Sequence, residues 1–351
     1  MMTEFTKMPK VYYTNTGAEG NEKAIAMSRN IRGLPNGLIL SRYPSYHGST
    51  SIAMSASGDF RLAFRGEIPG HVRVKDSPDG YPYTEKQAEP SKPLDSEKAV
   101  AIWEEHLLKH GPENFAAILT ESRSCTSGVY LYDNMYLTRL RALADKYDLL
   151  MICDEVASGF WRTGAAMSFH HEGIKPDFVV CSKGMVNGEI PGGALMFGQR
   201  PLDYFENNPL IFGSTQYACT LMLATIKSTL EGYVEEDIPS KVKAMEPVMN
   251  RMLREAFDKG GECIVDVRNN GGLTACIDFK EGKDKFAMNS LIDRIADENC
   301  LATRVGPPQD GVCRMYIIPP LIITEEQLQY AFDVVNEKIA PACNEMLASQ
   351  K

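Results

Sequence analysis

The sequence has no run of apolar residues long enough to cross a bilayer, and its beginning, MMTEFTKMPK, lacks the apolar core of a signal peptide. It also has no C-x-x-C pair, and its nine cysteines stand singly, several of them inside apolar runs. Scattered cysteines without Cys/His ligand spacing indicate reduced thiols and argue against a metal site. We therefore expect a soluble, cytoplasmic protein without a bound metal.

Clusters of lysine and arginine are absent as well. The 37 basic residues are outnumbered by 46 acidic ones, which gives a net charge of -9 and a pI near 5.3. A surface that binds nucleic acid or an anionic membrane needs clustered basic residues, so neither partner is expected. With 351 residues, 44% of them hydrophobic, the chain can bury a large core and is long for one compact unit, so two domains are expected.

Two short apolar runs near the middle of the chain end in charged residues. The run at 149–153 stops at Asp154-Glu155, and the run at 178–181 stops at Ser182-Lys183-Gly184. Continuous apolar runs of this kind are typical of parallel strands that are covered on both faces. Ligands of open α/β sheets bind beyond the carboxyl ends of the strands, so we expect Asp154 and Lys183 to reach one crevice.

An aspartate and a lysine placed in this way suit pyridoxal phosphate. The amine can form a Schiff base with the aldehyde, and the carboxylate can keep the pyridine nitrogen protonated. Taken singly, each residue has a plainer interpretation, as a structural aspartate or a solvated lysine. The surrounding runs, DEVASGFWRTG and then PDFVVCSKG, resemble the signature of the class III (ω-amino acid) pyridoxal-phosphate aminotransferases. The resemblance implies that Lys183 is the Schiff-base lysine, Asp154 the pyridinium partner and Val156 the apolar residue under the ring.

The resemblance spans most of the chain and implies a fold. Members of the family have fold type I, an α/β large domain with a mostly parallel seven-stranded sheet and a smaller α+β C-terminal domain. We assign residues 1–232 to the large, cofactor-binding domain and 233–351 to the small one. VRNNGGL at 267–273 and IIPPLIIT at 317–324 resemble two further family motifs. Residues 69–93 are rich in proline, glycine and polar residues and predict a long polar loop.

A glycine turn between a predicted strand at 10–14 and a predicted helix at 18–29 makes a candidate phosphate site. The backbone N–H groups of Gly17 and Ala18 would point at an anion from the start of the helix. An ordinary strand-to-helix turn is the alternative. NTGAEGNEKA nevertheless resembles the family's phosphate loop, with Ala18 where the family often has a hydroxyl.

Two more segments resemble cofactor-contacting parts of the family. Tyr46-His47-Gly48 matches its Tyr-His-Gly, which implies that the Tyr46 ring stacks on the cofactor ring; an aromatic loop anchor is the alternative. Glu121, after a predicted strand at 116–120, fits the glutamate that the family places beside the cofactor, although Ser122 replaces the usual proline. Arg61 and Arg65 are interpreted as solvated charges.

Two residues complete the predicted site. Gly213-Ser214-Thr215 resembles the family's Gly-x-Thr, which implies that Thr215 reaches the phosphate of a neighbouring subunit's cofactor and that the protein is a homodimer with shared sites. A helix cap is the alternative. Arg304 occupies the position of a mobile arginine that binds the substrate carboxylate in many ω-transaminases, and a surface arginine is its alternative.

The activity implied by the resemblance is transfer of an amino group from an ω-amino acid or amine to a keto acid such as pyruvate. The chain begins almost at the phosphate loop, whereas family members usually carry a sizeable segment before it. A truncated, catalytically impaired homologue that acts as a binding protein is therefore an alternative. A pyridoxal-phosphate aminomutase of the same fold is another.

Overall fold

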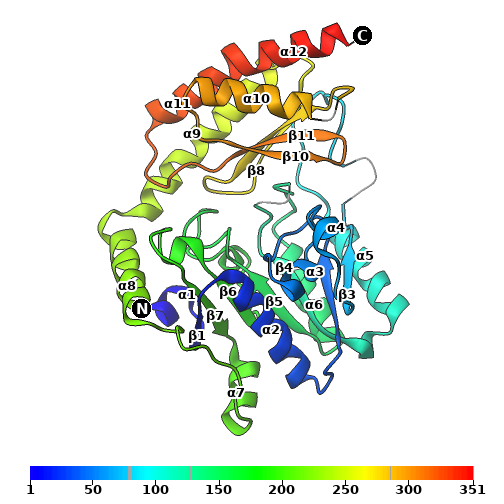
Figure 1. The fold of residues 1–351 in the computed structure, drawn as a ribbon, viewed down its shortest axis with the longest axis vertical. Coiled ribbons are helices and arrows are strands. Elements are labelled where there is room, and N and C mark those ends of the chain that lie inside the picture. The colour runs from blue at the N-terminus through cyan, green and yellow to red at the C-terminus, as the bar shows by residue number, and fades with distance from the viewer. Residues whose placement is uncertain (78–80, 126–127, 285, 351) are drawn as a thin grey trace.

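The computed structural model of this chain describes residues 1–77, 81–125, 128–284 and 286–350. Within these ranges the strands form two separate sheets, one of seven strands and one of four. The larger sheet lies in the N-terminal part of the chain, and the smaller one lies in the C-terminal part (Figure 1). The prediction of a fold with two parts of unequal size agrees with this arrangement.

The seven-stranded sheet has the order β1-β7-β6-β5-β4-β2-β3. The pairs β3–β2, β2–β4, β4–β5 and β5–β6 are parallel, while β7 runs antiparallel to both β6 and β1. The sheet is therefore mostly parallel, which confirms the predicted fold class. Its strands are β1 (Lys10–Thr14), β2 (Leu38–Arg42), β3 (His71–Val74), β4 (Phe115–Glu121), β5 (Leu150–Asp154), β6 (Phe178–Cys181) and β7 (Gly193–Phe197).

Helices cover both faces of this sheet, which explains why its central strands are apolar throughout. Every residue of β4 and β5 is buried. Alternate residues of β5 point to opposite faces, so Met151 packs in the same cluster as Trp103 and Leu140, whereas Ile152 packs with Ile25. The covering helices are α2 (Gly17–Ile31) on one face, and α5 (Ser96–His110) and α6 (Tyr136–Lys146) on the other.

The four-stranded sheet is antiparallel, with the order β10-β11-β9-β8. Helices gather on one of its faces, and its other face is turned toward the larger part of the molecule (Figure 1). The elements are α9 (Ile238–Lys259), β8 (Ile264–Asn269), β9 (Ala275–Lys280), α10 (Ala287–Glu298), β10 (Arg304–Gln309), β11 (Val312–Ile317), α11 (Glu325–Val334) and α12 (Ala340–Ser349). A π-helical turn at Val335–Ile339 joins the last two helices.

The remaining helices are short, except for the one that leads from the first part to the second. That helix, α8 (Thr220–Glu235), crosses the predicted boundary at residue 232, and the division into domains there stays a prediction. Every helix among the described residues is too short or too polar to span a membrane. The short helices are α1 (Met2–Thr6), α3 (Ser51–Ala56), α4 (Leu62–Arg65) and α7 (Gln199–Asn207).

The prediction of a polar loop over residues 69–93 was wrong at its beginning. His71–Val74 forms the edge strand β3, which pairs in parallel with β2. The strand is short and directly follows Pro69-Gly70, so local composition hides it. It forms because β2 offers a free edge at this point and because Val74 is buried.

We expect His71 to make the fold sensitive to acid. Burial, and after it the charges of Arg29 and Arg73, lower the pKa of His71 to about 4. As the pH falls below about 6.5, this histidine is protonated in the unfolded chain but stays neutral in the folded one. The free energy of unfolding therefore decreases until the pH reaches the pKa of His71 in the folded protein. The loss from this group reaches up to about 2 kcal/mol near pH 5, at 1.36 kcal/mol per unit of pKa difference.

Thermal unfolding of the His71→Gln variant at neutral and at acidic pH measures this effect. The variant should lose less stability than the parent protein between the two conditions. Replacement of the exposed His110 by Gln serves as the control and should leave the acid sensitivity unchanged. An acid sensitivity that is the same in all three proteins would rule out His71 as its source.

Candidate active site

A cavity of about 220 Å³ lies at the carboxyl ends of the central strands of the large sheet. Asp154, the last residue of β5, and Lys183, which follows the end of β6, both line it. The two strands are adjacent and parallel, so the same topology that makes the sheet delivers both side chains to one place. The expectation that these two residues reach a common crevice therefore agrees with the structure.

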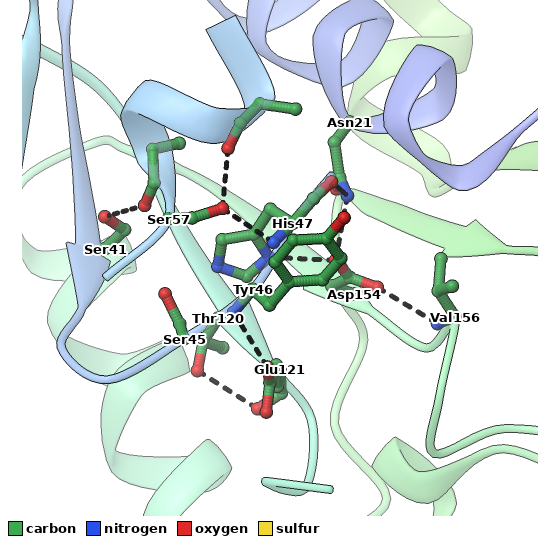
Figure 2. A network of polar contacts seen from close by, with 12 residues as sticks. Asn21, Ser41, Ser45, Tyr46, His47, Ser57, Thr120, Glu121, Asp154 and Val156 are labelled. Atoms are coloured by element: carbon green, nitrogen blue, oxygen red, sulfur yellow. Dashed lines mark hydrogen bonds and ion pairs between the residues drawn. The ribbon is translucent and has the colours of Figure 1, made fainter. Parts of the chain in front are cut away.

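Three donors hold the carboxylate of Asp154 (Figure 2). Asn21 Nδ2 and His47 Nδ1 each lie 2.8 Å from Oδ2, and the backbone N–H of Val156 donates to Oδ1 at 3.0 Å. The partner of His47 Nδ1 is a carboxylate, so we assign the proton of the ring to that nitrogen. Asp154 is only 4% exposed, and its orientation is fixed from three directions.

The sequence did not reveal the role of Asn21, although the motif that contains this residue was identified. Asn21 lies in the phosphate-loop segment NTGAEGNEKA and is buried on α2. Its amide donates both to Asp154 Oδ2 and to the backbone carbonyl of His47, at 2.8 Å in each case. One side chain thus ties the start of α2 to the end of β5 and to the Tyr-His-Gly loop.

Lys183 has a backbone conformation that is uncommon for a residue with a side chain. Its φ is 40°, in the left-handed region, and it begins a short 3₁₀ turn, Lys183–Met185. Such a conformation costs ~1–3 kcal/mol and is found most often at functional sites. The preceding Ser182 anchors the turn by donating from its hydroxyl to the carbonyl of Gly192 at 2.7 Å. Lys183 is exposed and lines the cavity.

The predicted phosphate loop lies at the edge of this cavity, and its role stays a prediction. Gly17 and Ala18 begin α2 and line the same cavity as Asp154, and the first N–H groups of a helix have no partner within it. A Cβ on Gly17 would lie 2.5 Å from Val156 Cγ2, and a Cβ on Gly48 would lie equally close to Ala18 Cβ. Glycine is therefore needed at both positions for the loops to pack this closely.

Tyr46 and Val156 both line the cavity, as the predicted stacking on two faces of a ring requires. Arg61, predicted to be a solvated charge, is partly exposed but also makes two contacts that were not predicted. Its guanidinium lies 4.2 Å from the centroid of the Tyr46 ring, and Asp59 holds it through hydrogen bonds of 2.6 and 2.8 Å. The sequence separates Arg61 from Tyr46 by a helix, so no local pattern could reveal this contact.

Glu121 also lines the cavity, at the end of β4. Its Oε1 accepts a hydrogen bond from the backbone N–H of Tyr46 at 3.1 Å, and its Oε2 accepts one from the N–H of Cys125 at 3.3 Å. Burial raises the pKa of Glu121, while Arg42, at 3.7 Å, opposes that effect. The carboxyl group is thus buried beside the cavity, and the loop that contains Tyr46 helps to hold it in position.

Thr215 is not brought to this cavity, and the prediction for Arg304 falls on a side chain outside the described part of the structure. Thr215 is exposed in the segment before α8 and is not among the residues that line the cavity. Arg304 begins β10, and its side chain lies outside the part of the structure that can be described. Conversely, Arg123 lines the cavity and was not predicted. It directly follows Glu121-Ser122, so its place in the motif was the available signal.

The geometry fits pyridoxal phosphate. A fixed carboxylate and a lysine lie in one cavity, a helix begins at its edge, and an aromatic and a branched apolar side chain line its walls. These are the groups that a pyridine ring, an aldehyde and a phosphate need. The fit rests on Asp154, Lys183, Gly17, Tyr46 and Val156.

Comparison with known proteins gives the same assignment. The family model described as aminotransferase class-III matches residues 1–339. An acetylornithine aminotransferase of Synechocystis sp. is 27% identical over 348 residues, which are 97% of this chain and 74% of the relative. A probable gamma-aminobutyrate transaminase 4 of Oryza sativa subsp. japonica is 28% identical over 356 residues, which are 98% of this chain and 73% of the relative.

A solved structure is similar over nearly the whole chain. It is that of a taurine:2-oxoglutarate aminotransferase from Bifidobacterium kashiwanohense in complex with PLP and glutamate. The TM-score is 0.87 and the sequence identity 32%, with 99% of this chain and 78% of that chain covered. The chain therefore belongs to the class III aminotransferase family, with the fold type I architecture and pyridoxal phosphate as its cofactor.

Proposed function

We propose that this aminotransferase moves an amino group from an ω-amino acid or amine to a keto acid such as pyruvate, with Lys183 as the residue that forms the Schiff base. The observation that carries the proposal is the presence of Asp154 and Lys183 in one cavity at the ends of adjacent strands. The relatives named above support the class of donor. Acetylornithine, gamma-aminobutyrate and taurine each carry an acid group at a distance from an amine.

Each cofactor-binding residue has a distinct proposed task. The backbone N–H groups of Gly17 and Ala18 bind the phosphate at the start of α2. With the cofactor bound, Asp154 would be the partner of the pyridine nitrogen, and Tyr46 and Val156 would restrain the ring from its two sides. Glu121 and His47 lie beside these groups, and His47 acts through its contact with Asp154.

Lys183 carries the proton transfer. Bound at this site, pyridoxal phosphate supplies the aldehyde that accepts the amino group and a ring that withdraws electrons. Lys183 Nζ would then serve as the base that takes a proton from the donor carbon and later gives it back. The left-handed backbone of Lys183 and its place in the lining of the cavity support both proposed tasks.

Further parts of the proposal concern the surroundings of the site. We propose a homodimer in which Thr215, in its exposed segment, reaches the phosphate site of the partner subunit. Arg304 is proposed to bind the acid group of a substrate. A cytoplasmic location stays a prediction from the scattered, unpaired cysteines.

The visible spectrum of the purified protein tests the proposed function. A visible absorption band should disappear when an ω-amino acid or amine is added and should return when pyruvate follows, with one keto product formed per cofactor. An aminomutase would return the band without pyruvate. A colourless protein that cannot be reconstituted with the cofactor would contradict the proposal and favour an impaired homologue.

A further inference from the structure

A second, larger cavity of about 960 Å³ adjoins the cofactor cavity. Lys183, Val156 and Ala157 line both, so these residues form part of the boundary between the two cavities. Much of the larger lining is apolar. It includes Phe160 from the loop after β5, Tyr233 of α8, Ile238 at the start of α9, and Ile318, Leu321 and Ile322 from the segment after β11. A donor amine that reaches Lys183 can extend its remaining atoms into this space.

Arg162 also lines the larger cavity. Its Nη1 donates to the backbone carbonyls of Leu273 at 3.1 Å and Pro319 at 2.7 Å. No hydrogen bond joins Nε or Nη2 of Arg162 to any residue that the structure describes. One side of the guanidinium is thus anchored on backbone while the other side has N–H groups to donate.

No carboxylate within the described ranges forms an ion pair with Arg162. Burial lowers the pKa of this guanidinium, and the neighbouring groups that oppose the effect are Cys125 and Tyr233. Glu189 and Glu236 line the same cavity, but both are exposed, and Glu236 pairs with Lys241. A partly buried cation without a countercharge is costly unless an anion joins it.

Arg123 makes a useful comparison. It lies close to Asp154 in the lining of the cofactor cavity, but both of its terminal nitrogens are engaged. Nη1 donates to the carbonyl of Asn270 and Nη2 to Asn134 Oδ1, each at 3.0 Å. Arg162 is better suited than Arg123 to bind an anion, because its Nε and Nη2 make no hydrogen bond to a described residue. These two nitrogens can donate to both oxygens of one acid group.

We propose that Arg162 binds the acid group of the amino donor, a carboxylate or a sulfonate, while the donor amine lies at Lys183. The larger cavity would then select donors with an apolar middle between an amine and an anionic end. This inference rests on the proposed function, because it names the substrate class of the same site. Arg162 is a specificity-determining residue in this arrangement.

Single-turnover kinetics with two series of donors tests the proposal. One series is unbranched ω-amino acids, and the other is alkylamines of matched length without the acid group. The Arg162→Gln variant should lose roughly 10-fold to 100-fold in kcat/KM with the ω-amino acids, because it loses a charge-assisted hydrogen bond, and far less with the alkylamines. Arg162→Lys should retain part of the activity, because lysine keeps the positive charge but lacks the planar guanidinium that donates to two oxygens at once.

Glutamine keeps a donor for the carbonyls of Leu273 and Pro319, so the variant separates anchoring from anion binding. The exposed Arg251→Gln provides the control for loss of a surface charge. Equal losses with both series would assign Arg162 a purely structural role and overturn the proposal. A selective loss in Arg304→Gln but not in Arg162→Gln would overturn it as well.

A readout that needs no amino transfer distinguishes failure of this inference from failure of the proposed function. An unbranched carboxylate without an amine should raise the Tm of the parent protein, because a ligand that binds only the folded state stabilises it. The shift should be lost in Arg162→Gln. A shift of equal size in both proteins, or no shift in either, would contradict carboxylate binding at Arg162 whatever the enzyme does with amines.

Discussion

Replacement of Lys183 by alanine should remove the visible absorption band of the cofactor and lower the rate of amino transfer by about 10⁴-fold. In the proposed function the amine both holds the aldehyde and acts as the base, and no other lysine lines either cavity among the described residues. Absorption spectra and half-reactions with an ω-amino acid measure the two losses separately. The fold should persist, because the side chain is exposed and the backbone strain does not depend on it.

Lys175→Ala is a matched control, since Lys175 is an exposed lysine in the segment before β6. It should keep both the spectrum and the rate of the parent protein. Lys183→Arg adds a second test, because it retains the charge but lacks an amine that can condense with an aldehyde. Activity near that of the parent in either Lys183 variant would remove this residue from the mechanism and leave the chemistry without its proposed base.

Replacement of Asp154 by asparagine should lower kcat by roughly 10²-fold to 10³-fold, the range found when one preorganised electrostatic partner is removed from an active site. The amide has the shape of the carboxylate but only one acceptor oxygen. It cannot accept from Asn21, His47 and Val156 in the arrangement that Figure 2 shows. It also cannot hold a proton on the pyridine nitrogen, so the ring withdraws electrons less well.

Steady-state kinetics together with the dissociation constant of the cofactor measures the effect of Asp154→Asn. We expect a large fall in kcat but only a moderate fall in the free energy of unfolding, because a buried donor left without an acceptor costs only about 1–3 kcal/mol. Asp145→Asn, on the exposed end of α6, removes a carboxylate far from the site and serves as the control. Unchanged kcat in Asp154→Asn would mean that this carboxylate supports the loops rather than the cofactor.

The central part of the fold was predictable because its signals are local. Leu150–Asp154 and Phe178–Cys181 are unbroken apolar runs that end at polar residues, and the structure has both as buried parallel strands. The strand ends then follow from topology, so Asp154 and Lys183 meet without any knowledge of the intervening chain. The family and the fold class, both predicted from motifs around these ends, are confirmed.

Other elements of the fold could not be predicted, because they form through contacts between segments that are distant in the sequence. The strands Arg304–Gln309 and Val312–Ile317 were missed because their polar residues mask the alternation, and Arg314 among them is buried only because Asp278 on β9 pairs with it. The helix Ala287–Glu298 was missed as well, since no hydrogen bond from a side chain caps its beginning.

The same limit applies to the site. The role of Asn21 depends on Asp154, 133 residues away, and the environment of Arg61 depends on Tyr46 across a helix. Sequence motifs identified several of the residues that line this cavity, Asp154 and Lys183 among them, but not Arg123. They did not show which side chains hold Asp154 in place, because such a role depends on the polar groups that the fold brings near.

The position of Lys183 in a wall shared by two cavities has an evolutionary consequence. The cavity on one side is lined by residues at the ends of β4 and β5 and at the start of α2, whereas residues of α8 and of the chain after β11 line part of the other. Under the proposed role of the larger cavity, mutations in this second set reshape the space for the donor without disturbing the vitamin-derived ring. Preference for one amine or another would then drift between lineages while the underlying chemistry is inherited intact.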